Sequence, residues 1–293
     1  MNKRHVWNTA LKLQNTALMG RGDFDVFNLL TIFSCGQDDD IDVVEPEVSY
    51  LFEDGFESVN NDLNDLFPLD GSRWTNIQLV DPDNGENTIE LNTTTVNEQD
   101  YALKIIAKPS DDILSKADIE KGGFSAPVGA NISIQAKFFI ETSEDLQDLL
   151  LIDLEYCSCW DPTVPDNQCP GIRLMMKEEN YLSIERGKIL GSTIAQTEVA
   201  FPIGEWVDLE WQMKLSPDDS GENVLTINGQ EVINALAKNM PNADEFRAEA
   251  AMNGISFELQ EPLAYERIQI GATANPTPHE VVMYVDDFRV EIE

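Results

Sequence analysis

The stretch VLTINGQEVI, residues 224–233, contains the strongest short-range fold signal in the chain. Two β-rich runs flank Asn228-Gly229, and a type I′ turn requires positive φ at both central positions, which Asn and Gly adopt most readily. The stretch therefore predicts a β-hairpin. Immediately upstream, EWVDLEWQMKL (205–215) has the composition of another strand.

Strand-like segments separated by turn residues continue over the chain from Tyr50 onward. The clearest are residues 102–107, 130–141, 148–156, 171–176, 181–186, 205–215 and 266–272. The last predicted strand is EVVMYVDDFRVEIE, residues 280–293. Strict alternation along it predicts one face with Val285 and Asp287 and the other with Asp286 and Phe288.

One segment predicts a helix, NADEFRAEAAMNG at 242–254. Asn242 is a suitable N-cap, acids occupy the first turn, and Gly254 is a suitable stop. Many short strands, few helices and no repeat of 20–50 residues predict an all-β sandwich of two antiparallel sheets with one inserted surface helix. A sandwich of this size usually has one concave sheet, which forms a groove.

The charge of the chain excludes several partners. The 293 residues include 54 acids and 19 Lys or Arg residues, for a net charge of −35. Such a chain repels nucleic acid and anionic membrane surfaces. The acids are spread along the sequence, which is typical of a solvated surface. The sequence has no apolar run of the roughly 18 residues that a membrane-spanning helix needs.

The segment FNLLTIFSCGQDDD, residues 27–40, resembles the end of a bacterial lipoprotein signal peptide. Its Asp38-Asp39-Asp40 run resembles the export tag of surface lipoproteins in the Bacteroidota. The resemblance implies a leader at 1–34, lipidation at Cys35, an acidic tether at 35–48, and an outer-membrane lipoprotein that contacts the membrane only through its lipid anchor. The region upstream is polar and its apolar core is short, which departs from the pattern. The alternative is a disordered leader with a stray cysteine.

Three cysteines lie in YCSCWDPTVPDNQC, residues 156–169. Their spacing lacks C-x₂-C and no histidine is near, which argues against zinc. Export would allow a disulfide to persist. We expect one disulfide from Cys169 to Cys159 or to Cys157, across a Pro-rich loop that holds Trp160 at the mouth of the groove.

The order of segments resembles a known family. LFEDGFES (51–58), NISIQAKFFI (131–140), the stretch from Gly204 to Val232, and YVDDFRVEI (284–292) are similar to the concanavalin A-like jelly roll of heparin lyase I type polysaccharide lyases. The resemblance covers about residues 50–293 and implies a jelly-roll domain at 49–293. It implies an exported protein that binds a polysaccharide and cleaves it by β-elimination, together with outer-membrane glycan uptake proteins as partners. Two alternatives stay open: a non-catalytic glycan-binding module and a structural envelope protein.

A lyase of this kind needs a base, an acid, and a group that neutralises the uronate carboxylate. The catalytic candidates are Tyr181, Arg173 and Lys116. The candidate carbohydrate-binding residues are Trp160, Arg186, Lys188 and Tyr265. His279, in a loop before the last strand, is a weaker candidate base.

Two further expectations concern carboxylates. Related jelly rolls hold a structural Ca²⁺ between the first and last strands, and the matching acids are Glu53, Glu57 and Asp286, whose hard oxygens suit that ion. Asp153 and Glu155 share a strand face, as a hydrolase pair would. The position where laminarinases place a third acid is Ser158, so hydrolysis is the weaker alternative.

Overall fold

The Asn228-Gly229 turn connects β12 (Glu222–Ile227) to β13 (Gln230–Leu236). The turn residues have φ values of 51° and 75°, and Ile227 lies opposite Gln230, so the predicted hairpin is confirmed. The computed structural model describes residues 50–82, 85–109, 115–144, 146–156, 170–187, 191–252, 254, 259, 261–274 and 278–293. The described residues belong to one compact unit.

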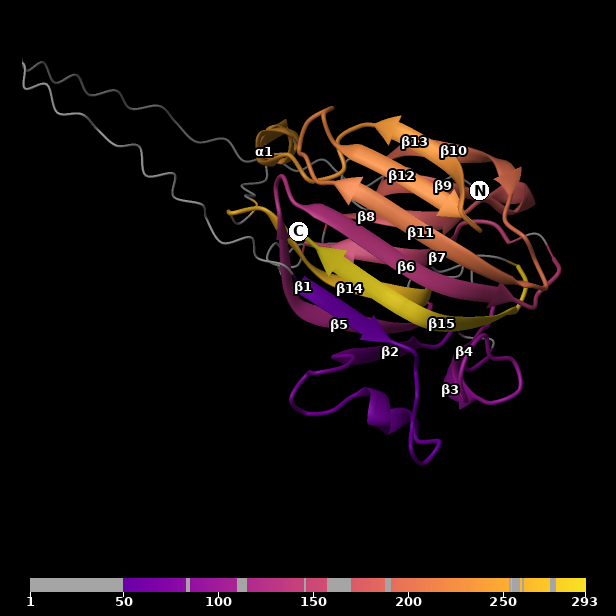
Figure 1. Cartoon of the computed structure of the whole chain (residues 1–293). Helices are drawn as coiled ribbons and strands as arrows, with labels where there is room; N and C mark the ends of the chain where they lie inside the picture. Colours follow the sequence, from indigo (N-terminus) through magenta and orange to yellow (C-terminus); the bar gives the residue numbers. More distant parts are fainter. Residues whose placement is uncertain are drawn as a thin grey trace, which may run out of the picture. The chain divides into compact units, whose positions relative to one another are not determined.

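Two antiparallel sheets form the described part of the chain (Figure 1). Sheet A has the order β13-β12-β11-β6-β15-β4-β3, and β1 also pairs with β15. Its other strands are β11 (Trp206–Lys214), β6 (Asn131–Ile140), β15 (Val281–Ile292), β4 (Ala102–Ala107), β3 (Thr88–Asn92) and β1 (Tyr50–Asp54). Figure 1 shows β12, β11, β6 and β15 stacked in front of β8, β7 and β14 of the second sheet.

Sheet B has the order β10-β9-β8-β7-β14-β5-β2. Its strands are β10 (Ser192–Ala200), β9 (Tyr181–Gly187), β8 (Gly171–Met176), β7 (Leu149–Glu155), β14 (Ala264–Ala274), β5 (Lys116–Pro127) and β2 (Asn76–Val80). The short 3₁₀ turns are η1 (Leu63–Leu66) and η2 (Glu178–Asn180). The predicted class, an all-β concanavalin A-like jelly roll with a small inserted helix, is confirmed.

The core lies between the two sheets because each strand presents alternate apolar residues to it. In β11, Val207, Leu209 and Trp211 are fully buried, while the intervening residues face outward. In β7, Ile152 and Leu154 face the same core from sheet B. The side chains on the other face of sheet B therefore do not belong to this core. They include the candidate site.

The inserted helix is α1 (Ala243–Met252). The Asn242 Oδ1 atom accepts hydrogen bonds from the backbone N–H groups of Asp244 (3.1 Å) and Glu245 (3.2 Å), which confirms the predicted N-cap. Gly254 has φ of 72° and donates its N–H to the Ala251 carbonyl at 3.0 Å, as expected of a helix stop. Within the described residues, none of the helices has the length and apolar character needed to cross a membrane.

Strict alternation along the last strand is wrong beyond Asp286. The pairing of β15 with β6 shifts register between Asp286 and Arg289, and Asp287 has φ of 47°. This β-bulge adds a residue to one strand and reverses which side chains point inward. Val285 faces the core before the bulge, and Phe288 and Val290 face it afterwards.

Candidate functional site

A row of polar side chains crosses the outer face of sheet B. The strand register aligns Glu120 on β5, Gln269 on β14, Asp153 on β7, Arg173 on β8 and Glu185 on β9. We call these five residues the polar row. They alternate with core residues such as Ile152 and Ile270, so the twofold period of the strands points the whole row away from the core.

Ion pairs connect the polar row to its neighbours. The Arg173 Nε atom donates to the Asp153 Oδ2 atom at 3.1 Å. The Arg267 guanidinium pairs with Glu155 through its Nε atom at 2.7 Å, and its Nη1 atom lies 3.3 Å from the Glu120 Oε2 atom. The two central arginines of this face are thus already paired with carboxylates.

The carboxylates of this face are shielded from water, although they point away from the core. Glu155 is fully buried and Asp153 is 2% exposed. The side chains of Arg267 and Arg173 are 30% and 12% exposed. A ligand therefore reaches this face first at the arginines.

Asp118 lies next to the polar row, two residues before Glu120 on β5. Burial raises the pKa of its carboxyl to about 8; the nearby Lys116 opposes the shift, and the negative charge of Glu120 adds to it. The carboxyl therefore keeps its proton at neutral pH. Neither of its oxygens has a hydrogen-bond partner in the described part of the chain.

The Gln269 Oε1 atom and the Arg173 Nη2 atom of this face are also buried without a hydrogen-bond partner among the described residues. Buried polar groups in native proteins are nearly always hydrogen-bonded. An acceptor, a donor and a protonated carboxyl thus remain available on one face of one sheet.

A glycine allows the position of Arg173. A Cβ atom built on Gly187 would lie 2.3 Å from the Arg173 Nε atom and 2.4 Å from its Cζ atom. The guanidinium therefore lies across the β9 backbone, where any other residue would displace it. Gly171, opposite Gly187 in the register, is also closely packed, because its Cβ would lie 2.6 Å from the Leu154 carbonyl oxygen.

The three predicted catalytic residues share the outer face of sheet B but do not converge. Lys116 donates to the Gln78 Oε1 atom at 3.3 Å. Tyr181 and Lys116 each lie four residues from the polar row along their strands, a distance of about 13 Å at 3.3 Å per residue. Arg173 is the one catalytic candidate that lies in the row itself.

The predicted carbohydrate-binding residues have different surroundings. Tyr265 is 1% exposed, and its hydroxyl donates to the Asn239 carbonyl at 2.6 Å. Burial also raises the pKa of that hydroxyl. Tyr265 is thus a core residue and not a rim aromatic, and we remove it from the set that contacts a sugar. Arg186 donates to the Ser192 Oγ atom at 3.2 Å. Trp160, Lys188, Cys35, Cys157, Cys159 and Cys169 lie outside the described residues.

The acids expected to hold Ca²⁺ have protein partners. Glu53 pairs with Arg289. The Glu57 Oε1 atom accepts the Tyr101 N–H at 3.0 Å, and the Asp286 Oδ2 atom accepts the Asn97 N–H at 3.0 Å. No group of three or more His, Cys, Asp or Glu side chains in the described chain is placed to hold a metal ion. Ca²⁺ binding there stays an untested prediction.

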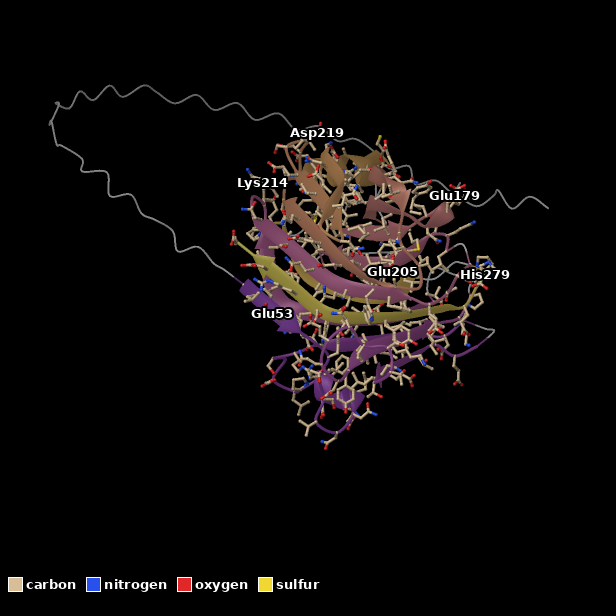
Figure 2. All side chains as sticks on the ribbon, turned by 45° about the vertical axis from the view of Figure 1, so that its right-hand side comes forward. Glu53, Glu179, Glu205, Lys214, Asp219 and His279 are labelled. Atoms are coloured by element: carbon tan, nitrogen blue, oxygen red, sulfur yellow. The ribbon has the colours of Figure 1, made fainter. Side chains whose placement is uncertain are left out.

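A hollow of about 390 Å³ lies on the outer face of sheet A. Its Glu210 Oε1 atom accepts hydrogen bonds from Gln135 (3.1 Å) and Gln212 (2.6 Å), so its polar groups bond to one another. Figure 2 labels Lys214 beside this hollow and His279 at the opposite end of the sandwich, just before β15. The polar row remains the stronger candidate because it has unpartnered buried groups.

Sequence reasoning missed Glu185 on β9 and four residues on β5 and β14, namely Asp118, Glu120, Arg267 and Gln269. The signal for the last four was the alternation of polar and apolar residues in KADIEKG (116–122) and ERIQIGA (266–272). That alternation predicts strands, but it does not show that the two segments pair.

No protein-family model matches the chain, and no curated protein sequence matches it significantly. Among solved structures, it is similar to the cellulose-induced protein Cip1, with a TM-score of 0.53 and 15% identity over 82% of this chain and 96% of that one. It is also similar to an endo-β-1,4-glucuronan lyase from the fungus Trichoderma reesei, with a TM-score of 0.52 and 10% identity over 74% and 90% of the two chains.

At these identities the comparisons show the fold alone. They show that the chain shares its fold with these two proteins, one of which is a polysaccharide lyase. Neither of these two structures is a heparin lyase, so that finer resemblance stays a prediction.

Proposed function

We propose that the chain binds a polysaccharide on the outer face of sheet B, at the polar row. The observation that carries the proposal is the hydrogen-bonding capacity left on this face: the Arg173 Nη2 donor, the Gln269 Oε1 acceptor and the Asp118 carboxyl. Sugar hydroxyls both donate and accept, so they suit a mixed set of this kind. The names of the similar structures support the choice of a polysaccharide.

Arg173 and Gln269 lie on β8 and β14, with β7 between them. Two strand spacings separate their backbones by about 10 Å. A chain of sugars that runs across the strands would therefore meet the donor and the acceptor in turn. These atoms are buried, so a glycan can reach them only after the groups that cover them have moved.

Cleavage by β-elimination is the second candidate. It is favoured by Arg173, Tyr181 and Lys116 sharing one face, and by the activity in the name of the similar glucuronan lyase. A rise of absorbance at 235 nm with a uronate polymer requires β-elimination and tests this candidate directly.

Affinity electrophoresis in native gels containing dissolved glycans tests the binding proposal. We expect at least one glycan to retard the protein, and Gln269→Met to remove most of the retardation, because Met keeps the shape of the side chain and lacks the amide. Gln135→Met, on sheet A, is the matched control and should migrate like the wild type. If no glycan retards the wild-type protein, the proposal is wrong.

Export is proposed on separate grounds. The similarity of residues 27–40 to a lipoprotein signal suggests that Cys35 carries a lipid and that the domain lies on the outer membrane. Metabolic labelling with a radioactive fatty acid should mark the wild-type chain and leave Cys35→Ser unlabelled. Equal labelling of both chains would contradict this assignment.

A further inference from the structure

We infer that the polysaccharide bound at the polar row is a neutral glycan and not a polyuronate. The inference rests on the proposed function and names its substrate class. It differs from what the resemblance to lyases implies, because those enzymes act on uronates. Three features of the described residues support it: the pairing of the arginines, the charge balance of the face, and the type of atom left without a partner.

The first feature is that the charge of each central arginine is already balanced by a buried carboxylate. Arg173 bonds to Asp153, which is 2% exposed, and Arg267 bonds to Glu155, which is fully buried. A uronate could bond to the Arg173 Nη2 atom, but it would meet an ion pair with no net positive charge unless it replaced the buried carboxylate. Removing one member of a buried ion pair leaves the other charge buried and uncompensated, which is strongly unfavourable.

The second feature is the charge balance on β5, β7, β8 and β14. Their outward cations are Arg173, Arg267 and Lys116. Against them stand three outward carboxylates, Glu120, Asp153 and Glu155, besides Asp118, which keeps its proton near neutral pH. These charges cancel. Each sugar of a polyuronate would add one negative charge to a face that has no positive excess to receive it.

Lys177, which lies at the Glu185 end of the polar row, adds no excess positive charge there. Its Nζ atom lies 2.8 Å from the Asp148 Oδ1 atom and 3.0 Å from the Glu185 Oε1 atom. The chain as a whole carries a net charge of −35. A polyanion is therefore repelled on approach as well as at the site, whereas a neutral glycan meets neither barrier.

The third feature is the type of atom left without a partner. The Arg173 Nη2 atom donates and the Gln269 Oε1 atom accepts, and the protonated Asp118 carboxyl can do both. A carboxylate group accepts hydrogen bonds but donates none, so the Gln269 oxygen requires a hydroxyl group of the ligand and gains nothing from a carboxylate. Hydroxyl groups can satisfy all three.

The test compares retardation of the full chain in gels containing neutral glycans (laminarin, hydroxyethylcellulose, xyloglucan) and polyuronates (alginate, polygalacturonate, glucuronan), at low and at high salt. We expect at least one neutral glycan to bind at least ten times more tightly than every polyuronate. We also expect that affinity to change less than twofold with salt, because no ion pair to the ligand is involved. A polyuronate that binds as tightly as the best neutral glycan would overturn the inference and leave the proposed binding intact. Failure of all glycans to bind would overturn both.

A variant gives an independent check. Asp153→Asn removes the charge that holds Arg173 and should raise affinity for alginate or polygalacturonate at least threefold at low salt. Asp208→Asn makes the same charge change on β11 of sheet A, where Asp208 lies 3.6 Å from Lys137, and should leave polyuronate binding unchanged. An equal gain in both variants would show that net charge alone, and not the pairing of Arg173, excludes polyuronates. If Asp153→Asn does not fold, the salt dependence of the wild-type protein decides.

Discussion

Replacing Asp118 with Asn should make the protein more stable at high pH. The carboxyl is fully buried and has no hydrogen-bond partner in the described chain. Burial penalises its ionised form and raises its pKa from 3.8 to about 8. An asparagine has nearly the same shape and never ionises, so it avoids this penalty.

The sign of the effect follows from linkage. A carboxyl whose pKa is higher in the folded state contributes its full stability below the unfolded pKa, near pH 4, and that contribution is lost as the pH rises through about 8. Each tenfold change in proton affinity is worth about 1.4 kcal/mol, so the full loss is about 6 kcal/mol. Between pH 5 and pH 9 the loss is about 4 kcal/mol.

Urea denaturation of the wild type and Asp118→Asn, at a series of pH values from 5 to 9, measures this loss. The free energy of unfolding of the wild type should fall relative to the variant by up to about 4 kcal/mol across the range. Asp208→Asn, at an exposed site of sheet A, controls for the loss of one charge and should follow the wild type. Parallel curves for the wild type and Asp118→Asn would refute the assignment of a buried, protonated Asp118.

The remaining predictions concern single contacts. Gly187→Ala should displace the Arg173 guanidinium and weaken glycan retardation at least fivefold. Unchanged retardation would contradict the proposal that glycan binding depends on the position of Arg173 over Gly187. Tyr265→Phe leaves the buried Asn239 carbonyl without its donor and should lower the free energy of unfolding by about 1–3 kcal/mol, measured by urea denaturation. Gly229→Ala places a side chain at φ of 75° and should cost about 1–2 kcal/mol in the same assay, with glycan binding unchanged.

Elements with local signals were predictable from the sequence. The hairpin at Asn228-Gly229 and the ends of α1 at Asn242 and Gly254 depend on the backbone preferences of a few adjacent residues. The bulge at Asp287 was not predictable, because the alternation of apolar residues continues through it and only the pairing with β6 reveals the extra residue. Strands β1, β2, β3 and β10 also lacked a sufficient local signal.

The polar row was not predictable because it depends on strands far apart in the chain. Arg267 and Glu155 are separated by 112 residues, and Gln269 and Glu120 by 149. Sequence reasoning placed Asp153 and Glu155 on one face of a strand, and that face is the outer one. It could not supply the arginines that pair with them, since neither β8 nor β14 identifies its neighbours by sequence alone.

The ion pair between Arg173 and Asp153 also bears on the choice between glycan binding and cleavage by β-elimination. β-Elimination needs a base at the proton next to the uronate carboxylate while a cation holds that carboxylate. Arg173 is the cation within the polar row, yet it bonds to Asp153, and Tyr181 lies about 13 Å from the row along its strand. A uronate held at Arg173 would therefore have to extend along β9 for Tyr181 to act as its base. Binding requires no such convergence, and the donor and acceptor atoms left on this face are enough for it. The arrangement of the described residues therefore favours recognition of a glycan over its cleavage.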